Sequence, residues 1–457
     1  MKSNHFAIIG GGIAGLSAAY YLEKLGIKYT LFEESSQLGD TMNSQAIDEF
    51  TIEKTSNTIL LSDQRAFDLF NDLDLEIKDL YSQAHNIHIV KNKKCIPLPT
   101  SFLSFIKSSL FSANAKLKII TEPFRRNNPY GQEESVSQFI IRRFDKETLD
   151  YAVNPFIESI IAGNADSLSI EYTFPTLYNI EKKYGSIIGG FFYDRKIIKP
   201  NKIKSSFFSL KNDISQFAEK FSQLSEGSIL CQSKIYDIRK MDDGYNLSFT
   251  QNGKDLSFFC NNIISTIPTH KLKKITLDGQ QSIDFKELSQ ISYPPFISIS
   301  IGFKSEDIAC SLRGVKVLVP KCENMNISGV IFYSSSSNKQ VEEDHYLLKV
   351  FIGGSHQNKL KKISKTQRLD LVMADLKTLF NISGEPLFVR ETLWEKSLPQ
   401  YHVGYGHYKS IMNMIEAKLP NFYFAGNYVN GVSIQDTILS SMDLIDKRLG
   451  SDYFLSD

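Results

Sequence analysis

Three glycines and a glutamate near the N-terminus have the residue types and the spacing of a nucleotide-binding site. Gly10, Gly12 and Gly15 form the pattern G-x-G-x-x-G, and Glu33 follows 23 residues after Gly10. In this pattern the first glycine permits a tight turn, the second lets the backbone approach a pyrophosphate, and the third lets a helix pack on a strand. A carboxylate at position 33 can accept both hydroxyls of an adenosine ribose. These residues predict a dinucleotide-binding site.

The elements expected around these residues agree with that prediction. Residues 5–9 favour a strand, residues 13–25 a helix that ends at Gly26, and residues 28–32 a second strand. The phosphates would lie at the positive N-terminus of the helix. An export signal needs an unbroken apolar run, and three adjacent glycines interrupt this one. We therefore expect a βαβ unit and not an export signal.

Composition limits the classes of protein to which the chain can belong. Its 457 residues suit two or three domains, and a net charge of only +1 implies no nucleic-acid partner. The five cysteines are scattered without a C-x-x-C pair, which favours free thiols in a reducing cytosol. His85 and His88 have no cluster of other ligands near them in the sequence, so we expect no metal site. There is no apolar run of ~18 residues that would span a membrane.

A second glycine turn lies near the C-terminus, in the stretch YFAGNYVNGVSIQD (residues 423–436). The pattern predicts a strand, a turn, and a helix that begins at about Ser433. Gly426 and Gly431 leave backbone N–H groups free at the start of that helix, where negative charge is stabilised. Residues 215–265 favour a helix, a hairpin and a return strand, the layout of the second lobe of a flavin-binding domain.

The C-terminal stretch resembles the closing FAD motif of the protoporphyrinogen oxidase family, within the wider group of flavin amine oxidases. Most of the wider group has Gly-Asp where this chain has Gly426 and Asn427, and the Asn followed by G-V-S narrows the choice to the porphyrinogen oxidases. Residues 154–190 and 394–408 resemble the same family. The resemblance covers nearly the whole chain.

The resemblance implies an α/β fold in which a Rossmann-like FAD-binding domain of the amine oxidase type is interrupted by a mixed α+β substrate domain and a helical region. We expect the FAD-binding domain to be discontinuous, formed by residues 1–85, 207–285 and 386–457. Residues 86–206 would form the helical region that contacts substrate or membrane, and residues 286–385 the strand-rich substrate domain.

The resemblance also implies a non-covalently bound FAD and assigns residues to it by position. Gly10, Gly12, Gly15 and Glu33 would bind the ADP half, and the backbone of Ile235 would meet the adenine. The ribityl and flavin parts would be surrounded by Gly426, Asn427, Val432 and Ser433, with Asn57 in a further contact region. No catalytic side chain is assigned, because the cofactor performs the redox step and the protein mainly orients the substrate.

The activity implied by the resemblance is oxidation of a porphyrinogen to a porphyrin in haem biosynthesis, with hydride transfer to flavin N5 and O2 as the final acceptor. The substrate would be protoporphyrinogen IX or coproporphyrinogen III. Two alternatives stay open: a diverged flavin amine oxidase or desaturase acting on another small molecule, and a protein that binds FAD or porphyrin without catalysis.

Several departures from the family motivate those alternatives. Glycine-bearing turns of the family are altered at residues 39–41, 55–56 and 212–213. A branched side chain at Thr55 stands where the backbone would pass close to the flavin. The basic residue that many relatives place in the hairpin near residue 96 is Ile96 here. The candidates to replace it are Lys93, Lys94 and Arg125.

Residues 101–120 place Phe102, Phe105, Ile106 and Leu110 on one face of an expected helix. Such a face suits either a membrane surface or the cover of a core. We expect a cytoplasmic protein with peripheral contact to the inner membrane through this segment. The expected partners are the porphyrinogen and O2, and the assembly is left open between monomer and homodimer. Residues 48–61 favour a loop, and residues 66–80 favour a helix.

Overall fold

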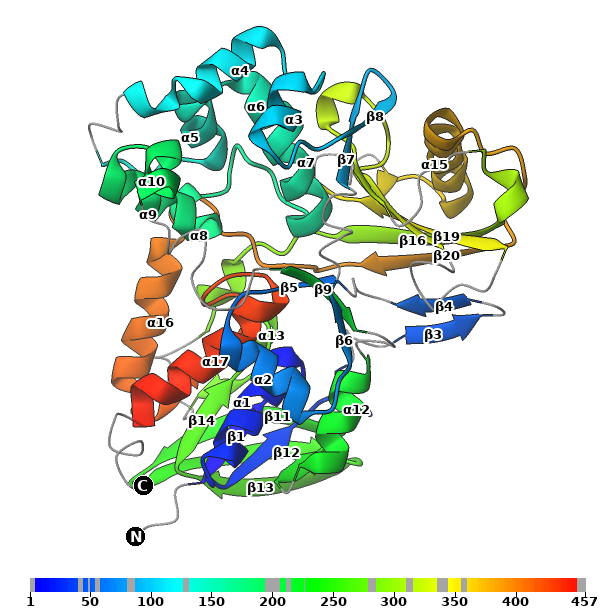
Figure 1. Cartoon of the computed structure of the whole chain (residues 1–457). Coiled ribbons are helices and arrows are strands. Elements are labelled where there is room, and N and C mark those ends of the chain that lie inside the picture. Colours follow the sequence, from blue (N-terminus) through cyan, green and yellow to red (C-terminus); the bar gives the residue numbers. More distant parts are fainter. Residues whose placement is uncertain are drawn as a thin grey trace.

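The fold has two halves, which Figure 1 shows one above the other. The lower half is built around a parallel sheet, and the upper half combines a larger sheet with a group of helices. The computed structural model describes residues 5–39, 44–47, 50–53, 58–79, 87–125, 131–193, 206–210, 215–225, 227–277, 285–309, 315–334, 344–354 and 360–449.

The parallel sheet has the strand order β10-β2-β1-β14-β21, so its strands come from distant parts of the chain. Every neighbouring pair in it is parallel. The strands are β1 (Phe6–Ile9), β2 (Tyr29–Phe32), β10 (Ser228–Leu230), β14 (Asn262–Ser265) and β21 (Phe422–Phe424). Strands β1, β2, β14 and β21 are buried along their whole length, as expected for a parallel sheet covered on both faces. This arrangement confirms the α/β, Rossmann-like prediction.

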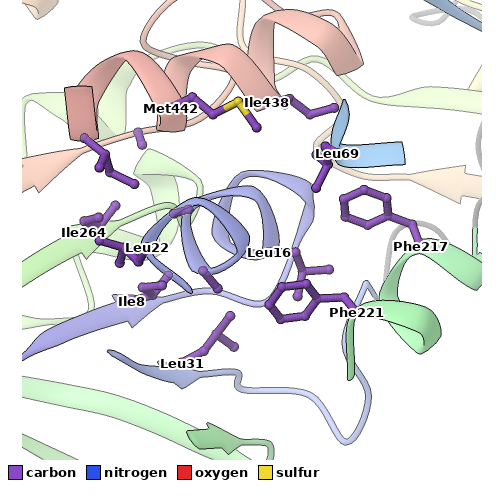
Figure 2. Packing of buried hydrophobic residues seen from close by; sticks show 14 of the residues in the cluster. Ile8, Leu16, Leu22, Leu31, Leu69, Phe217, Phe221, Ile264, Ile438 and Met442 are labelled. Carbon is purple, nitrogen blue, oxygen red and sulfur yellow. The ribbon is translucent and has the colours of Figure 1, made fainter. Parts of the chain in front are cut away.

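Helix α1 (Ile13–Lys24) lies at the centre of one covering layer. Figure 2 shows its side chains Leu16 and Leu22 packed between the sheet and three further helices. These are α2 (Gln64–Asp72), α12 (Ser215–Leu224) and α17 (Ile434–Leu449). Burial of each apolar side chain here contributes about 1.5–3 kcal/mol to the free energy of folding. A helix from the first residues of the chain is therefore stabilised by contacts with helices from its middle and its end.

The other face of the parallel sheet is covered by a mixed sheet of order β13-β12-β11-β15, in which β15 runs parallel to β11 and the other pairs are antiparallel. Its strands are β11 (Ser233–Met241), β12 (Gly244–Gln251), β13 (Lys254–Cys260) and β15 (Thr276–Leu277). The same cluster includes Ile411 and Ile415 of α16 (Gly406–Lys418), beside α13 (Thr269–Leu272) and η6 (Leu288–Gln290).

A seven-stranded sheet dominates the upper half, in the order β20-β16-β19-β18-β17-β7-β8. Its strands are β7 (Ile87–Lys91), β8 (Lys94–Pro97), β16 (Phe296–Lys304), β17 (Lys316–Leu318), β18 (Gly329–Ser334), β19 (His345–Ile352) and β20 (Phe388–Trp394). Helix α15 (Lys365–Phe380) packs on one face through Val372 and Leu376. Short 3-10 helices η7 (Ser305–Asp307) and η8 (Lys321–Glu323) lie between its strands in sequence.

The helices of the upper half form a separate group beside this sheet. They are α3 (Phe102–Lys107), α4 (Ala113–Ile120), η3 (Glu122–Phe124), α5 (Val136–Arg143), α6 (Lys146–Thr148), η4 (Leu149–Val153), α7 (Asn154–Phe156), η5 (Ile157–Ile161), α8 (Ile170–Thr173), α9 (Pro175–Tyr184) and α10 (Ile187–Tyr193). A fully buried ion pair joins Arg143 to Glu122, whose carboxylate also accepts hydrogen bonds from Ile187 N (3.0 Å) and Ile188 N (3.1 Å). The pair therefore holds three of these helices together.

Two expectations about local structure were wrong. The loop expected over residues 48–61 contains β4 (Phe50–Glu53), paired with β3 (Ser44–Ile47), and β5 (Thr58–Leu61). Strand β5 pairs with β9 (Ser206–Leu210), which also pairs with β6 (Ile77–Asp79). The single helix expected over residues 101–120 is split, because Ser101 caps α3 and Ser112 caps α4.

The helix expected over residues 66–80 is shorter than the pattern predicted. Helix α2 ends at Asp72, and Asp74 takes a left-handed conformation with φ +51°. The apolar residues that follow, Leu73 and Leu75, are still buried, so they belong to the core without being helical.

Two parts of the upper sheet cross the expected domain boundaries. Strands β7 and β8 come from the segment expected to be helical, and β20 comes from the last segment assigned to FAD binding. The division into 1–85, 207–285 and 386–457, 86–206, and 286–385 therefore stays a prediction. Among the described residues, no helix is long and apolar enough to cross a lipid bilayer.

Candidate FAD-binding site

The residues that could bind a nucleotide lie together where the parallel strands end. Because all strands of the lower sheet run in one direction, their carboxyl ends meet at one edge, where α/β folds bind ligands. Gly10 follows β1, Glu33 follows β2, Thr266 follows β14, and Gly426 comes two residues after β21. Four segments from both ends and the middle of the chain therefore meet at this edge.

The first glycine turn fits the roles expected of its spacing. Gly10 has φ +111°, a conformation that favours glycine, and its N–H donates to Phe32 O at 2.8 Å. A Cβ placed on Gly15 would lie 1.8 Å from Gly10 O, so no larger residue fits where α1 meets β1. Gly12 is the N-cap of α1 and has no described atom within 4 Å of a Cβ built on it. This leaves an open approach to the N-terminus of the helix.

Glu33 lies beside this turn and is held in place by its neighbours. Its Oε2 accepts a hydrogen bond from Gly11 N at 2.6 Å, and its Oε1 accepts from the backbone N–H and the hydroxyl of Ser35, both at 2.8 Å. The carboxylate is therefore fixed at the position where a ribose would meet the glycine turn.

Ile235 is connected to the same edge through the backbone of β11. The N–H of Ser233 donates to Glu33 O at 2.8 Å, and Ile235 lies two residues further along the strand. Strand β15 pairs with β11 only at Asp237 and Ile238, after an irregularity in the β11–β12 register between Ile235 and Asp237. The backbone of Ile235 thus lies outside the β11–β15 ladder, while its side chain is buried.

Thr266 was not among the predicted site residues. Its hydroxyl donates to Ile9 O (2.9 Å) and lies within hydrogen-bond distance of Gly10 O (3.2 Å), so it supports the first glycine turn from the side. The signal in the sequence was the run of small polar residues and proline, STIP, that directly follows the apolar strand.

The C-terminal glycine turn is attached directly to the first helix. Gly426 N donates to Ser440 Oγ of α17 at 3.2 Å, and Ser441 Oγ of the same helix donates to Ala14 O at 2.8 Å. A Cβ on Gly426 would lie 3.8 Å from the Cβ of Ala14. The two motifs, more than four hundred residues apart in sequence, therefore form one site.

Ser433 and its neighbours begin helix α17. Ser433 Oγ accepts from Asp436 N at 3.0 Å, and Asp436 Oδ2 accepts from Ser433 N at 3.3 Å, a reciprocal cap of the helix N-terminus. Gly431 has φ +109°, and a Cβ there would lie 2.6 Å from Asp436 Oδ2. Asn427 and Val432 are half-buried on the same turn. The hydroxyl and the backbone N–H of Ser433 are thus both used by the cap of the helix.

Two tyrosines from residues 394–408 hold this turn in shape. Tyr401 donates from its hydroxyl to Asn427 O and accepts from Gly431 N at 2.7 Å, while the Tyr405 hydroxyl donates to Tyr428 O at 2.6 Å. Burial raises the pKa of both phenols, so they remain neutral donors at physiological pH. Sequence reasoning assigned this segment to the family but missed its role of positioning the turn.

The histidines take structural positions or lie on the surface. His407 is exposed and pairs with Glu287 at 3.3 Å, and His402 is half-buried, with a pKa lowered by burial. His88 lies on β7, and His85 lies outside the described residues. Across the described ranges, no group of three or more histidine, cysteine or acidic side chains is arranged to hold a metal ion.

The residues present fit an FAD. The tight glycine turn, the uncapped helix N-terminus and the fixed carboxylate suit a pyrophosphate and its ribose, and the turn at Gly426 lies against them. Asn57 and the altered turns at Asp40, Thr41, Thr55, Ser56, Asn212 and Asp213 lie outside the described residues. The individual contacts assigned to Gly10, Gly12, Gly15, Glu33, Ile235, Gly426, Asn427, Val432 and Ser433 stay predictions.

Comparison with known proteins agrees with this geometry. The family model described as flavin containing amine oxidoreductase matches residues 13–443. The chain belongs to this family. It is an FAD-dependent oxidoreductase, as predicted, and the edge that holds the two glycine turns is its candidate FAD site.

Its relatives include porphyrinogen oxidases over nearly the full length. Protoporphyrinogen oxidase 2, chloroplastic/mitochondrial, of Arabidopsis thaliana is 30% identical over 98% of this chain and 94% of that protein. Coproporphyrinogen III oxidase of Bacillus subtilis is 26% identical over 95% of each. A solved structure from Exiguobacterium sp. 255-15 shares the fold, with a TM-score of 0.77 and 22% identity over 98% of this chain and 99% of that one. The resemblance to the porphyrinogen oxidases is confirmed.

Proposed function

We propose that this protein oxidises a porphyrinogen, protoporphyrinogen IX or coproporphyrinogen III, to the corresponding porphyrin, with O2 as the final electron acceptor. The observation that carries the proposal is the full-length similarity to oxidases of both substrates, together with a site that fits FAD. When bound, FAD supplies the acceptor for hydride, at its N5 atom.

The chain's own residues bind and orient in this reaction. The turn that Tyr401 and Tyr405 hold would fix the pyrimidine end of the ring beside the start of α17, where a helix dipole stabilises negative charge. Gly12 and Glu33 would fix the other end of the cofactor. Because aromatisation of the substrate is strongly favourable, orientation and exclusion of side reactions are the main requirements on the protein.

Anaerobic reduction of the flavin separates this proposal from its main alternative. The FAD-loaded protein is mixed without O2 with either porphyrinogen or with a panel of primary amines and polyamines, and the flavin absorbance is followed. Rapid bleaching by a porphyrinogen alone is expected. Bleaching by an amine alone would contradict the proposal and favour a diverged amine oxidase.

We also propose that the helical region rests on a membrane surface. Exposed apolar side chains gather on its neighbouring elements α3, α4 and η3, and they are Phe102, Leu103, Ile106, Leu117, Ile120 and Phe124. Phe102 and Phe124 are 72% and 89% exposed, whereas Leu110 of the expected face is buried. Such a surface suits peripheral contact without insertion of a spanning helix.

Sedimentation with liposomes of mixed zwitterionic and anionic phospholipids tests this contact. Substitution of Phe102, Leu103 and Phe124 by Ser is expected to abolish co-sedimentation and leave FAD binding intact. A matched triple variant at exposed apolar positions elsewhere, Met241, Leu256 and Phe259, should co-sediment like the wild type. Equal binding by both variants would contradict the proposal.

A further inference from the structure

Three cations lie in one row across the seven-stranded sheet. The register pairs Lys316 with Ile331, Ile331 with Lys349, Lys349 with Ser300, and Ser300 with Arg390. Residues directly opposite each other on paired strands point to the same face of the sheet. Lys316, Lys349 and Arg390 therefore share a face, on every second strand, with backbones about 10 Å apart from one cation to the next.

This face is the one away from helix α15. On β19, Leu348 and Val350 belong to the cluster that packs on α15, and Lys349 between them must point to the opposite side. Val317 of β17 lies in the same cluster, so its neighbour Lys316 also points away from α15. Figure 1 shows α15 above the sheet and β4 below it, on the side of the FAD-binding half.

Apolar groups flank the row at both ends. At one end, the ring of Phe50 of β4 packs against that of Phe388 in a tilted arrangement, with ring centroids 4.7 Å apart. Phe50 also packs with Leu347, which lies one row from Lys349. At the other end, Ile87 and Ile96 pack with the cluster around Leu110 in the helical region. The charged row thus lies between apolar side chains from three different parts of the chain.

The row itself is positive, and its cations become more enclosed from the exposed Arg390 to the half-buried Lys316 and the buried Lys349. Lys349 is only 3% exposed, and burial lowers the pKa of Lys316 to about 8, which leaves its amine mostly charged at neutral pH. None of the residues that the register pairs in this row, or in the row on either side, on this face is Asp or Glu. Glu158 lies beyond these rows, against Gly354. Both lysines also have interactions within the protein, so a ligand would join existing contacts.

A flat apolar ligand that carries carboxylates matches this combination of groups. We propose that Lys316 and Lys349 bind two carboxylates of the porphyrinogen and hold the macrocycle on the sheet face turned to the FAD-binding half. The inference rests on the proposed function and deepens it. Arg390, on the exposed edge strand β20, is placed to meet a further carboxylate, so it serves the tetracarboxylate coproporphyrinogen III and not the dicarboxylate protoporphyrinogen IX.

Lys316 on this face can replace the basic residue that many relatives have where this chain has Ile96. Ile96 pairs with Ile89, and Ile89 with Leu318, which puts Ile96 one row from Lys316 on the same face. Of the replacements suggested by sequence, Lys93 and Lys94 are exposed at the hairpin turn, and Arg125 donates to Arg142 O at 3.0 Å. Lys316 is better placed than any of these.

Binding of the oxidised product tests the inference without turnover. The FAD-loaded full chain is titrated with protoporphyrin IX and with its dimethyl ester, in which both carboxylates are neutralised, and porphyrin fluorescence is followed. The wild type should prefer the diacid about tenfold or more, the factor that one charge-assisted hydrogen bond provides. Lys316→Met and Lys349→Met should each lose most of that preference by weakening the diacid alone, and Lys349→Arg should keep it.

Two controls complete the experiment. Lys377→Met removes the same charge from exposed α15, on the other side of the sheet, and should bind like the wild type. Arg390→Met should weaken coproporphyrin III and leave protoporphyrin IX unchanged. Flavin absorbance checks that each variant is folded, and if Lys349→Met fails to fold, Lys316→Met and Lys349→Gln carry the test.

The outcomes separate this inference from the proposed function. If the wild type oxidises a porphyrinogen while both Met variants retain the preference for the diacid and an unchanged KM, the lysine assignment is wrong and the function stands. If the FAD-loaded wild type neither binds porphyrin nor oxidises a porphyrinogen, the proposed function fails and the lysine assignment fails with it.

Discussion

The nucleotide-binding edge and the seven-stranded sheet encode their sites in different ways. At the edge, backbone geometry makes the site: Gly10 turns, Gly15 lets α1 touch β1, and helix N-termini supply the N–H groups. On the sheet, the site is a row of side chains, and Lys316 and Lys349 come together only through strand register. A site made by backbone geometry can be recognised from the spacing of its glycines in the sequence. A site made by strand register has no such spacing.

The largest effect is expected among the helices of the upper half, where the buried side chain of Arg143 forms ion pairs with Glu122 and Glu181. Arg143→Met leaves Glu122 as an uncompensated buried charge and should lower the free energy of unfolding by about 3–5 kcal/mol. Urea unfolding measures this. The surface pair variant Arg65→Met should cost less than about 1 kcal/mol. An equal loss of unfolding free energy in the two variants would show that the buried ion pair does not stabilise the fold more than a surface pair does.

Adding a methyl group should be most damaging in the backbone site. Gly15→Ala forces Cβ against Gly10 O and should cost about 3 kcal/mol or more, or about a hundredfold in FAD affinity. Gly12→Ala has room within the protein, so it should fold normally and weaken only the cofactor. Flavin fluorescence and unfolding midpoints distinguish the two. A Gly15→Ala protein with full FAD affinity would refute the close approach of α1 and β1.

The contact between Tyr401 and the C-terminal turn should give a smaller effect. Tyr401→Phe removes the hydroxyl that joins Asn427 O to Gly431 N, which should raise the Kd of FAD about tenfold, the equivalent of about 1.4 kcal/mol. Tyr20→Phe removes a surface hydroxyl that bonds Asp72 and should leave the Kd unchanged. If both variants bind FAD equally, the tyrosine does not position the turn.

The smallest expected effect is the pH dependence that His270 contributes. Burial, and then the neighbouring Lys396, lower its pKa from 6.5 to about 4, so between these values the unfolded chain binds more protons than the folded one. Stability should therefore fall as pH drops from 7 to 5, and less in His270→Asn. Thermal unfolding at both pH values measures the difference, and parallel loss in both proteins would contradict the assignment.

The elements predicted best from sequence were those with a strong local signal. The βαβ unit was expected within one residue at each end, and the helix expected at the start of residues 215–265 is α12. Strand β4 was missed because its Phe50 packs on the distant upper sheet, a contact that the local sequence does not show. Its partner strand β3 is close in sequence. The row of lysines was missed because Lys316 and Lys349 share a face only through the pairing of each with Ile331, and strand register cannot be read from periodicity.

The most direct test of the account is the growth of porphyrin fluorescence in air. Purified protein with FAD receives protoporphyrinogen IX or coproporphyrinogen III in parallel, against blanks without enzyme. The account predicts growth above the blank with at least one substrate, a KM for it that rises in Lys316→Met and Lys349→Met, and no change in Lys377→Met. Traces equal to the blank for both substrates, with FAD bound, would contradict it.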